Sequence, residues 1–198
     1  MKLLFLTKDD SKFNKMKEYL KDFKDLELVS PSVLGLTNIP EELSSIDNAI
    51  SYYELTGLPT ITLNSGLYID KFKTKEQPVL LRKKVNATET IKDYINNLNK
   101  HGGRSLAHYY SNISIIDNNG EVTTNTINGN EFLLVNKESK KVNLNGRLLD
   151  IISVDLDAGK YFNDRSTDEI ESHYKDPYNE LINFIKLTLY KEENERTL

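Results

Sequence analysis

Short apolar runs alternate with amphipathic segments along the first half of the chain. The apolar runs have the aliphatic and β-branched composition of buried strands, and they cover residues 2–6, 26–30 and 58–63. In the segments between and after them, apolar residues recur at helical spacing, over residues 11–23, 44–57 and 86–103. Because strands that are separated by helices pair in parallel, this alternation predicts an α/β protein.

The second half of the chain is richer in β-type segments. Residues 107–129 contain two β-rich runs joined at Asn118-Asn119-Gly120, a composition typical of a tight hairpin turn. Two further strands are expected, at residues 132–135 and 148–154. The chain ends in helical sequence that we expect to be divided near Pro177, with a polar tail that frays after Tyr190.

These elements predict one α/β domain over residues 1–198, because a chain of this length is long enough for one substantial core. The central sheet is expected to be mixed, with parallel connections early in the chain and an antiparallel hairpin later. Helices are expected on both sides of this sheet.

The composition excludes several classes of protein. Acidic and basic residues are interspersed and leave a net charge of −4, so nothing indicates a nucleic-acid partner. No apolar run has the length needed to span a bilayer, and the N-terminal run is too short for a signal peptide, so no membrane partner is expected. The absence of cysteine excludes disulfides, thiolate catalysis and zinc–thiolate sites, and a cytoplasmic location is expected.

The segment "TKDDSK" (residues 7–12) follows the first strand and begins the first helix. Small polar residues at a helix N-terminus present free N–H groups, and Lys12 adds a positive charge, so the segment suits a phosphate. The alternative is an ordinary N-cap with solvated charges, and it is the simpler interpretation because the glycine-rich phosphate-loop pattern is absent.

Carboxylates gather in "IPEELSSIDNA" (residues 39–49), before and within the start of a helix. Glu42 and Asp47 carry oxygen ligands of the kind that Mg²⁺ prefers. The alternative is that these acids only favour the dipole at a helix start, which is common.

The strand at residues 58–63 is followed by Asn64-Ser65-Gly66, which we expect to form a polar turn before Asp70. Small polar residues at the end of a buried strand are a usual place for chemistry in an α/β protein. Asn64, however, is an amide and cannot take up a proton. The alternative is a plain turn in which Ser65 and Gly66 serve geometry only.

The segment at residues 160–177 mixes charges of both signs. Lys160 and Arg165 have the reach to contact a ligand, but we expect a solvated face here. The three histidines are too scattered to indicate a metal cluster or a catalytic triad.

Taken in order, these segments resemble the inosine-triphosphatase family of purine nucleoside triphosphate pyrophosphatases. The first loop keeps Thr7 and Lys12 of a Thr-any-Asn-any-any-Lys pattern, with Asp9 in place of the asparagine. The strand that follows a Thr-Gly-Leu-Pro segment ends in "LNSGL", where the family has Asp-Asp-Ser-Gly-Leu. Further segments occur in the family's order: "IPEE" (39–42), "DNA" (47–49), "QPVLLRK" (77–83), "DNNGEV" (117–122) and "DRSTDE" (164–169).

The resemblance implies an elongated fold of two lobes that flank a cleft, with Thr7 and Ser65 lining that cleft. It implies a homodimer, Mg²⁺ dependence, and hydrolysis of a nucleoside triphosphate such as ITP or XTP to the monophosphate and pyrophosphate. The residues it assigns are, for catalysis, Asn64 (a degenerate position), Ser65 and Asp70; for the substrate, Thr7, Asp9, Ser11, Lys12, Gly66 and Lys175; and for the metal, Glu42 and Asp47.

The chain departs from the family pattern at four places. The acid pair before Ser-Gly-Leu is Leu63-Asn64, and the helix after "DNA" is about one turn shorter and has no counterpart for the family's lysine. The aromatic base-pocket motif appears only as "GRLLD", and the segment matched to Ser-His-Arg reads Tyr174-Lys175-Asp176. Two functions therefore stay open: a divergent pyrophosphohydrolase with reduced or lost activity, and a non-catalytic protein that binds a nucleotide or a partner.

Overall fold

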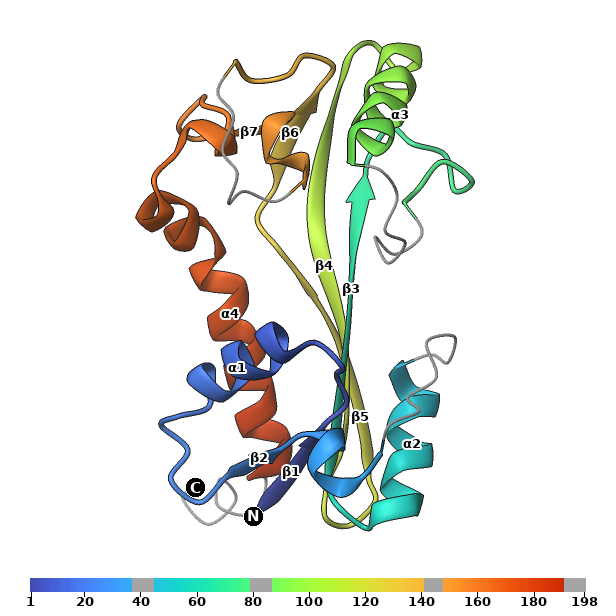
Figure 1. Ribbon diagram of the computed structural model, residues 1–198, viewed down its shortest axis with the longest axis vertical. Coiled ribbons are helices and arrows are strands. Elements are labelled where there is room, and N and C mark those ends of the chain that lie inside the picture. Colours follow the sequence, from blue (N-terminus) through green and yellow to red (C-terminus); the bar gives the residue numbers. More distant parts are fainter. Residues whose placement is uncertain (37–44, 79–86, 141–147, 191–198) are drawn as a thin grey trace. The chain divides into compact units, whose positions relative to one another are not determined.

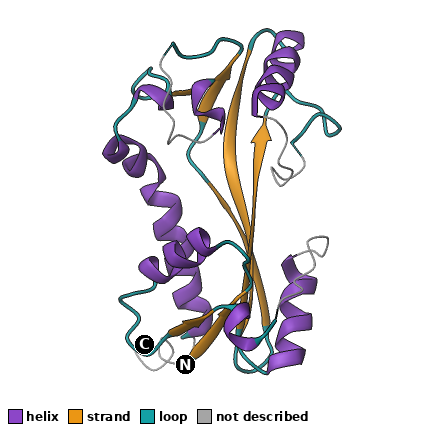
Figure 2. Cartoon of the chain, viewed as in Figure 1, coloured by secondary structure: helices purple, strands orange, loops and turns teal. Residues whose placement is uncertain are grey.

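The computed structural model describes residues 1–36, 45–78, 87–140 and 148–190. Strands and helices alternate in its first part, and strands dominate the middle (Figure 2). The strands are β1 (Lys2–Phe5), β2 (Glu27–Val29), β3 (Thr60–Ile69), β4 (Arg104–Ile116), β5 (Val122–Asn128), β6 (Phe132–Val135) and β7 (Ser153–Asp155). The helices are α1 (Asp10–Tyr19), α2 (Ser45–Thr56), α3 (Ala87–Lys100) and α4 (Thr167–Leu189), with short 3₁₀ segments η1 (Pro31–Leu34), η2 (Leu148–Ile151) and η3 (Phe162–Asp164).

The strands form one seven-stranded sheet, in the order β2-β1-β3-β4-β6-β7, with β5 also paired to β4. Strand β1 pairs in parallel with β2 and β3, as strand–helix–strand units require. Later in the chain, β6 pairs antiparallel with both β4 and β7. The predicted α/β class and mixed sheet are confirmed.

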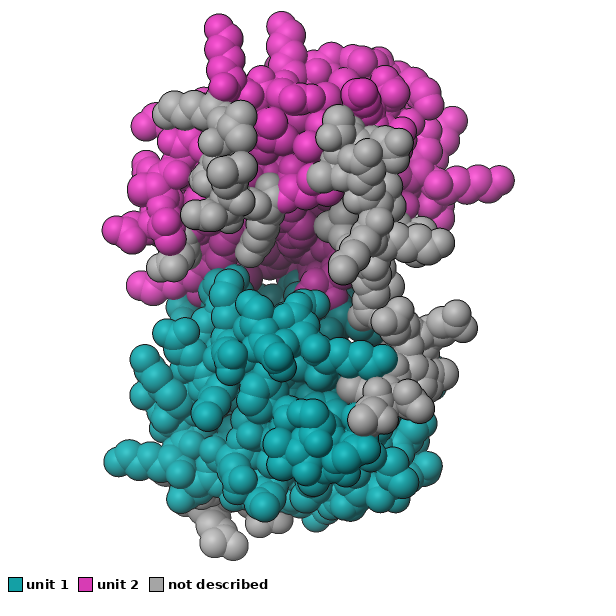
Figure 3. Space-filling model, viewed as in Figure 1, with its two compact units in different colours: residues 1–64, 111–127, 178–198 teal, residues 65–110, 128–177 magenta. Residues whose placement is uncertain are grey.

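The chain divides into two compact units, each drawn in its own colour in Figure 3. Unit 1 comprises residues 1–64, 111–127 and 178–198, and unit 2 comprises residues 65–110 and 128–177. The expected cleft between two lobes stays a prediction.

Unit 1 has helices on both faces of its sheet (Figure 1). Leu3 and Phe5 of β1 point to the face covered by α1 and the C-terminal part of α4, where they join a core with Met16 and Ile185. The intervening residue Leu4 points to the other face and packs with Tyr52 of α2, together with Leu6. This period-2 alternation makes β1 apolar throughout, as expected for a strand that is buried on both faces.

Unit 2 has its own core, in which α3, η2 and η3 pack on the strands. The largest buried members are Phe132 and Phe162, and Leu98 of α3 is fully buried against them. A β-bulge lies between β5 and β6, where they run beside β4. Gly129 N–H donates to Tyr109 O at 2.6 Å, so these two residues are opposite one another, whereas Phe132 lies opposite Ala107. Two residues of one strand, Asn130 and Glu131, are thus opposite the single residue between Ala107 and Tyr109.

Three predictions about local structure are wrong. The polar turn at Asn64-Ser65-Gly66 does not form, because β3 continues through it to bury Leu67 and Ile69 in unit 2. Helix α4 is not divided at Pro177, since the residues after it bury Leu181 and Ile185 in unit 1. The strand expected at residues 148–154 is the turn η2 followed by the short strand β7.

Some predicted features lie outside the described residues. They are the segment at residues 39–42 with Glu42, most of residues 77–83, Gly146, and the tail after Tyr190. In the described part of the chain, no helix combines the length and apolarity needed to cross a bilayer.

Candidate functional site

The loop between β1 and α1 closes around the carboxylate of Asp9. This carboxylate accepts hydrogen bonds from the backbone N–H groups of Ser11 (2.9 Å) and Lys12 (3.2 Å), so Asp9 is the N-cap of α1. The Asp9 N–H in turn donates to the Thr7 hydroxyl at 3.1 Å. Two of the N–H groups that the sequence analysis assigned to an anion are therefore already satisfied inside the loop.

The charge of Asp9 also acts against an anion at this helix end. The N-terminus of α1 carries a partial positive charge of about half a unit, which the full negative charge of Asp9 outweighs. Lys12, which is exposed, offsets part of that charge. A phosphate must therefore bind beside the Asp9 carboxylate or replace it on the N–H groups of Ser11 and Lys12.

Asn64, Ser65 and Gly66 lie within β3 and differ in their surroundings. Asn64 is half-buried, Ser65 is exposed and Gly66 is buried. A Cβ added to Gly66 would lie 2.4 Å from the ring of Tyr110 on the neighbouring strand β4. Packing of this ring across the strand therefore explains why a glycine is needed in "LNSGL", whatever else the segment does.

The structure does not bring Ser65 and Asp70 together as one catalytic pair. They are five residues apart along an extended backbone, which places them about 16 Å apart and on opposite faces of the sheet. Asp70 is exposed, and its N–H donates to Leu106 O at 3.0 Å. Thr7 belongs to unit 1 and Ser65 to unit 2, so their shared cleft stays a prediction.

The predicted metal ligands are only partly described. Asp47 is exposed in the first turn of α2, whereas Glu42 lies outside the described residues. Among the residues that the structure describes, no three His, Asp or Glu side chains come close enough to hold a metal ion. Asn64 offers a metal only a neutral carbonyl oxygen, and a magnesium site at Glu42 and Asp47 stays a prediction.

Unit 2 contains a buried charged cluster that the sequence analysis missed. The guanidinium of Arg165 donates to the Asp155 carboxylate, and His173 Nδ1 lies 3.2 Å from Asp155 Oδ2. The exposed fractions of these side chains are 9% for Arg165, 4% for Asp155 and 7% for His173. The ring of Phe162 lies under Arg165, at 5.7 Å, and meets the His173 ring edge-on at 4.9 Å.

Burial and charge fix the protonation states in this Asp155–Arg165–His173 cluster. Burial opposes the charge of Asp155, but the hydrogen bond from Ala158 N–H and the charge of Arg165 outweigh it and lower its pKa. Burial also lowers the pKa of His173, and the charge of Asp155 offsets only part of that effect. Neutral His173 therefore donates Nδ1–H to Asp155 and carries a lone pair on Nε2, which is buried and has no hydrogen-bond partner among the described residues.

The cluster corrects two interpretations of the C-terminal segment. Arg165 is not part of a solvated face, although Lys160 is exposed as expected. The residues matched to the family's Ser-His-Arg motif differ in their surroundings, because Tyr174 is buried while Lys175 and Asp176 are exposed. Ser172 and His173 match the first two residues of that motif if the motif is placed two residues earlier. This match is the signal in the sequence that could have pointed to His173 as a member of the cluster.

Comparison with solved structures finds the same fold in HAM1 proteins. A Ham1 protein from Staphylococcus aureus matches with a TM-score of 0.70 and 16% identity over 94% of this chain and 98% of its own. A HAM1 protein from Coxiella burnetii matches with a TM-score of 0.71 and 19% identity over the same shares of the two chains. A structure from Mycobacterium abscessus described as a nucleoside-triphosphatase / dITP/XTP pyrophosphatase matches with a TM-score of 0.65 and 18% identity, over 87% of this chain and 93% of its own.

No family model matches the chain, and no curated protein matches it. The solved structures agree with nearly the whole chain at identities below one in five. The protein therefore has the fold of the HAM1 proteins.

Proposed function

We propose that the protein is a divergent nucleoside triphosphate pyrophosphatase whose hydrolysis of deaminated purine nucleotides to monophosphate and pyrophosphate is reduced or lost. The observation that carries this proposal is the match of 94% of the chain to HAM1 proteins, joined to the order of its motifs. The likeness to the Mycobacterium abscessus pyrophosphatase supports nucleotide metabolism as the setting. A cytoplasmic homodimer belongs to the same proposal.

The site residues of this proposal are those of the sequence motifs. Thr7, Ser11 and Lys12 would contact phosphate at the start of α1, with Asp9 as their N-cap. Gly66 and Lys175 would lie along the substrate, Ser65 would serve catalysis, and Asn64 takes the place of a catalytic acid. Glu42 and Asp47 would hold Mg²⁺, which supplies charge neutralisation on the phosphates when it is bound.

A second candidate is a non-catalytic protein that binds a nucleotide or a protein partner through the same residues. Asn64 favours this candidate, because an amide can position a ligand by hydrogen bonding and cannot accept a proton. The two candidates share nucleotide binding and differ in turnover.

Nucleotide binding should raise the melting temperature of the full-length protein. A ligand at 100 times its dissociation constant stabilises the folded state by about 2.7 kcal/mol. The measurement is a thermal-shift series with ITP, dITP, XTP and the common dNTPs, with and without Mg²⁺, and with inosine as the control that lacks phosphate. Stabilisation with pyrophosphate release supports the enzyme and stabilisation without release supports the binder, whereas no response to any nucleotide contradicts both.

Asp9→Asn should strengthen binding of a triphosphate about two- to five-fold at low ionic strength. Asparagine is also a good N-cap, so α1 keeps its start while a negative charge beside the phosphates is removed, an effect of about 0.3–1 kcal/mol. The measurement is calorimetric titration at two salt concentrations, because screening should reduce the difference. Asp22→Asn, at an exposed position beyond the other end of α1, is the matched control, and equal affinities of the two variants would place the phosphates elsewhere.

A further inference from the structure

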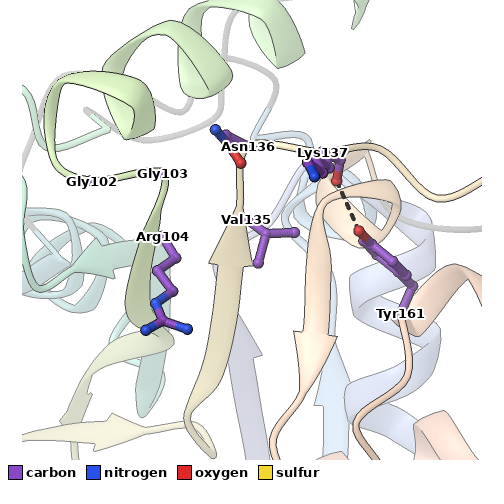
Figure 4. Close-up of a pocket in the computed structure, with 7 residues that line it drawn as sticks. All are labelled: Gly102, Gly103, Arg104, Val135, Asn136, Lys137 and Tyr161. Carbon is purple, nitrogen blue, oxygen red and sulfur yellow. Dashed lines mark hydrogen bonds between the residues drawn. The ribbon is translucent and has the colours of Figure 1, made fainter.

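A depression of about 310 Å³ lies in unit 2 where β4 begins and β6 ends (Figure 4). Its lining comes from the turn after α3, from the strand ends and from the segment before η3. The lining residues are Gly102, Gly103, Arg104, Val135, Asn136, Lys137 and Tyr161. None of them belongs to the site of the proposed function.

Backbone hydrogen bonds hold the floor of this depression in place. Gly103 N–H donates to Leu98 O at 2.7 Å, and Asn136 N–H donates to Gly103 O at 2.9 Å. Gly102 and Gly103 have φ angles of 85° and 78°, which favour glycine, so no side chain covers the turn. The closeness of the Asn136 amide is a second reason for glycine, since a Cβ on Gly103 would lie 3.0 Å from Asn136 Nδ2.

The walls are also fixed. Arg104 and Val135 are opposite one another in the β4–β6 ladder, so their side chains share one face of the sheet. The Tyr161 hydroxyl donates to Lys137 O at 3.1 Å, which ties the backbone of Lys137 to the segment before η3 (Figure 4). Two exposed cationic side chains and one aromatic ring therefore line one hollow.

The charge of the lining is positive and uncompensated. In the described part of the chain, neither Arg104 nor Lys137 forms an ion pair with a carboxylate. No acidic residue is among the described residues that line the depression, although the whole chain has a net charge of −4. The C-terminal end of α3 contributes a partial negative charge of about half a unit, which two full cations outweigh. Lys71 Nζ, which lies 3.4 Å from His101 O, offsets it further.

We propose that this depression binds a small phosphate-bearing anion, such as orthophosphate or a phosphomonoester. The guanidinium of Arg104 can donate two parallel hydrogen bonds to phosphate oxygens, and Lys137 adds a point charge. The volume is at the lower end of the range for ligand sites, which limits the ligand to a small molecule. Because none of the described lining residues is a histidine or a carboxylate, the site binds the anion and does not react with it.

Titration with inorganic phosphate tests this site directly. The amide signals of Gly102, Gly103 and Asn136 in a ¹H–¹⁵N spectrum should shift and saturate, at constant pH and ionic strength. The double variant Arg104→Ala/Lys137→Ala should bind phosphate at least about 10-fold more weakly, because it loses charge-assisted hydrogen bonds of about 1.5–3 kcal/mol each. The phosphate affinity of Arg104→Lys should lie between those of the wild type and the double variant, because lysine keeps the positive charge and loses the planar guanidinium.

Lys21→Ala/Lys24→Ala is the matched control, because it removes two exposed cations from unit 1. It should bind phosphate as the wild type does, and melting curves should show that both double variants are folded. Acetate should bind at least about 10-fold more weakly than phosphate, because it carries one charge and two oxygens. The proposal is overturned by unsaturable shifts in the wild type, by equal affinities of the two double variants, or by equal affinities for acetate and phosphate. Since the lining excludes Thr7, Ser11 and Lys12, failure here leaves the proposed function untouched.

Discussion

Asp155→Ala should lower the free energy of unfolding by about 3–5 kcal/mol, the usual cost of removing one partner from a buried ion pair. The substitution leaves the Arg165 guanidinium buried beside Phe162 without its counter-ion, and it leaves His173 Nδ1 without its acceptor. It also removes the acceptor for Ala158 N–H, which is bonded at 2.7 Å. We expect a marked fall in stability and no change of fold.

Urea denaturation followed by circular dichroism measures this change, with the m-value showing whether the transition stays two-state. Asp157→Ala is the matched control, since this exposed neighbour should change stability by less than about 0.5 kcal/mol. Arg165→Leu combined with Asp155→Ala should recover part of the loss, because it removes the isolated buried charge. Equal stabilities of Asp155→Ala and Asp157→Ala would show that the cluster contributes nothing.

A fall in pH should lower the stability of the protein through the same Asp155–Arg165–His173 cluster. The pKa values of His173 and Asp155 lie below their ordinary values in the folded state, so at acid pH the unfolded chain binds more protons and stability falls as the pH falls. For His173 this loss begins below its ordinary value of 6.5, well before Asp155 contributes near 3.8. In His173→Gln, the loss just below pH 6.5 should therefore be smaller than in the wild type.

Pyrophosphate release from ITP should be about 10²–10⁴-fold slower than in a relative that has a carboxylate at the position of Asn64, the usual effect of losing a general base. Attack of water on a phosphorus centre requires a group that accepts a proton, and Asn64 cannot. Asp70 does not substitute for the missing carboxylate, because it lies just beyond the end of β3, about 20 Å from Asn64 along the extended chain.

The measurement is pyrophosphate release from ITP, dITP and XTP by the wild type, by Asn64→Asp, and by the Mycobacterium abscessus protein as the reference. Asn64→Asp should raise the rate, whereas Asn119→Asp, in the exposed hairpin turn, should leave it unchanged. A wild-type rate equal to that of the reference contradicts the idea of a degenerate site. A rate raised equally by both variants would be a charge effect unrelated to position 64.

The elements that local patterns specify were predictable from the sequence. The strands β1 and β2 follow from short apolar runs and the helices α1 to α3 from a hydrophobic period of about three and a half, and all lie close to their predicted bounds. The hairpin that joins β4 to β5 follows from Asn118-Asn119-Gly120. In these cases, propensity, periodicity and turn chemistry all favour the same structure.

The wrong predictions come from contacts between residues that are far apart in the sequence. Ser65 and Gly66 look like a turn in isolation, but the ring of Tyr110 packs over Gly66 and extends the strand. Pro177 looks like a helix end, but burial of Leu181 and Ile185 continues α4 beyond it. Arg165 looks solvated, because a sequence does not show that Asp155 and His173 surround it.

Because of the β-bulge between β5 and β6, the exact number of residues in this connection decides which face of the sheet the side chains of β6 occupy. Ile127 before the bulge and Phe132 after it both point into hydrophobic cores, although they are an odd number of residues apart. Loss of Asn130 alone would remove the bulge and leave Glu131 opposite the single residue between Ala107 and Tyr109, so Phe132 would stay opposite Ala107 with its side chain in the core. Loss of two residues would put the pairing out of phase by one residue and turn Phe132 and Leu134 towards the opposite face. Of the natural or engineered changes of length at this point, the loss of one residue should therefore be tolerated better than the loss of two.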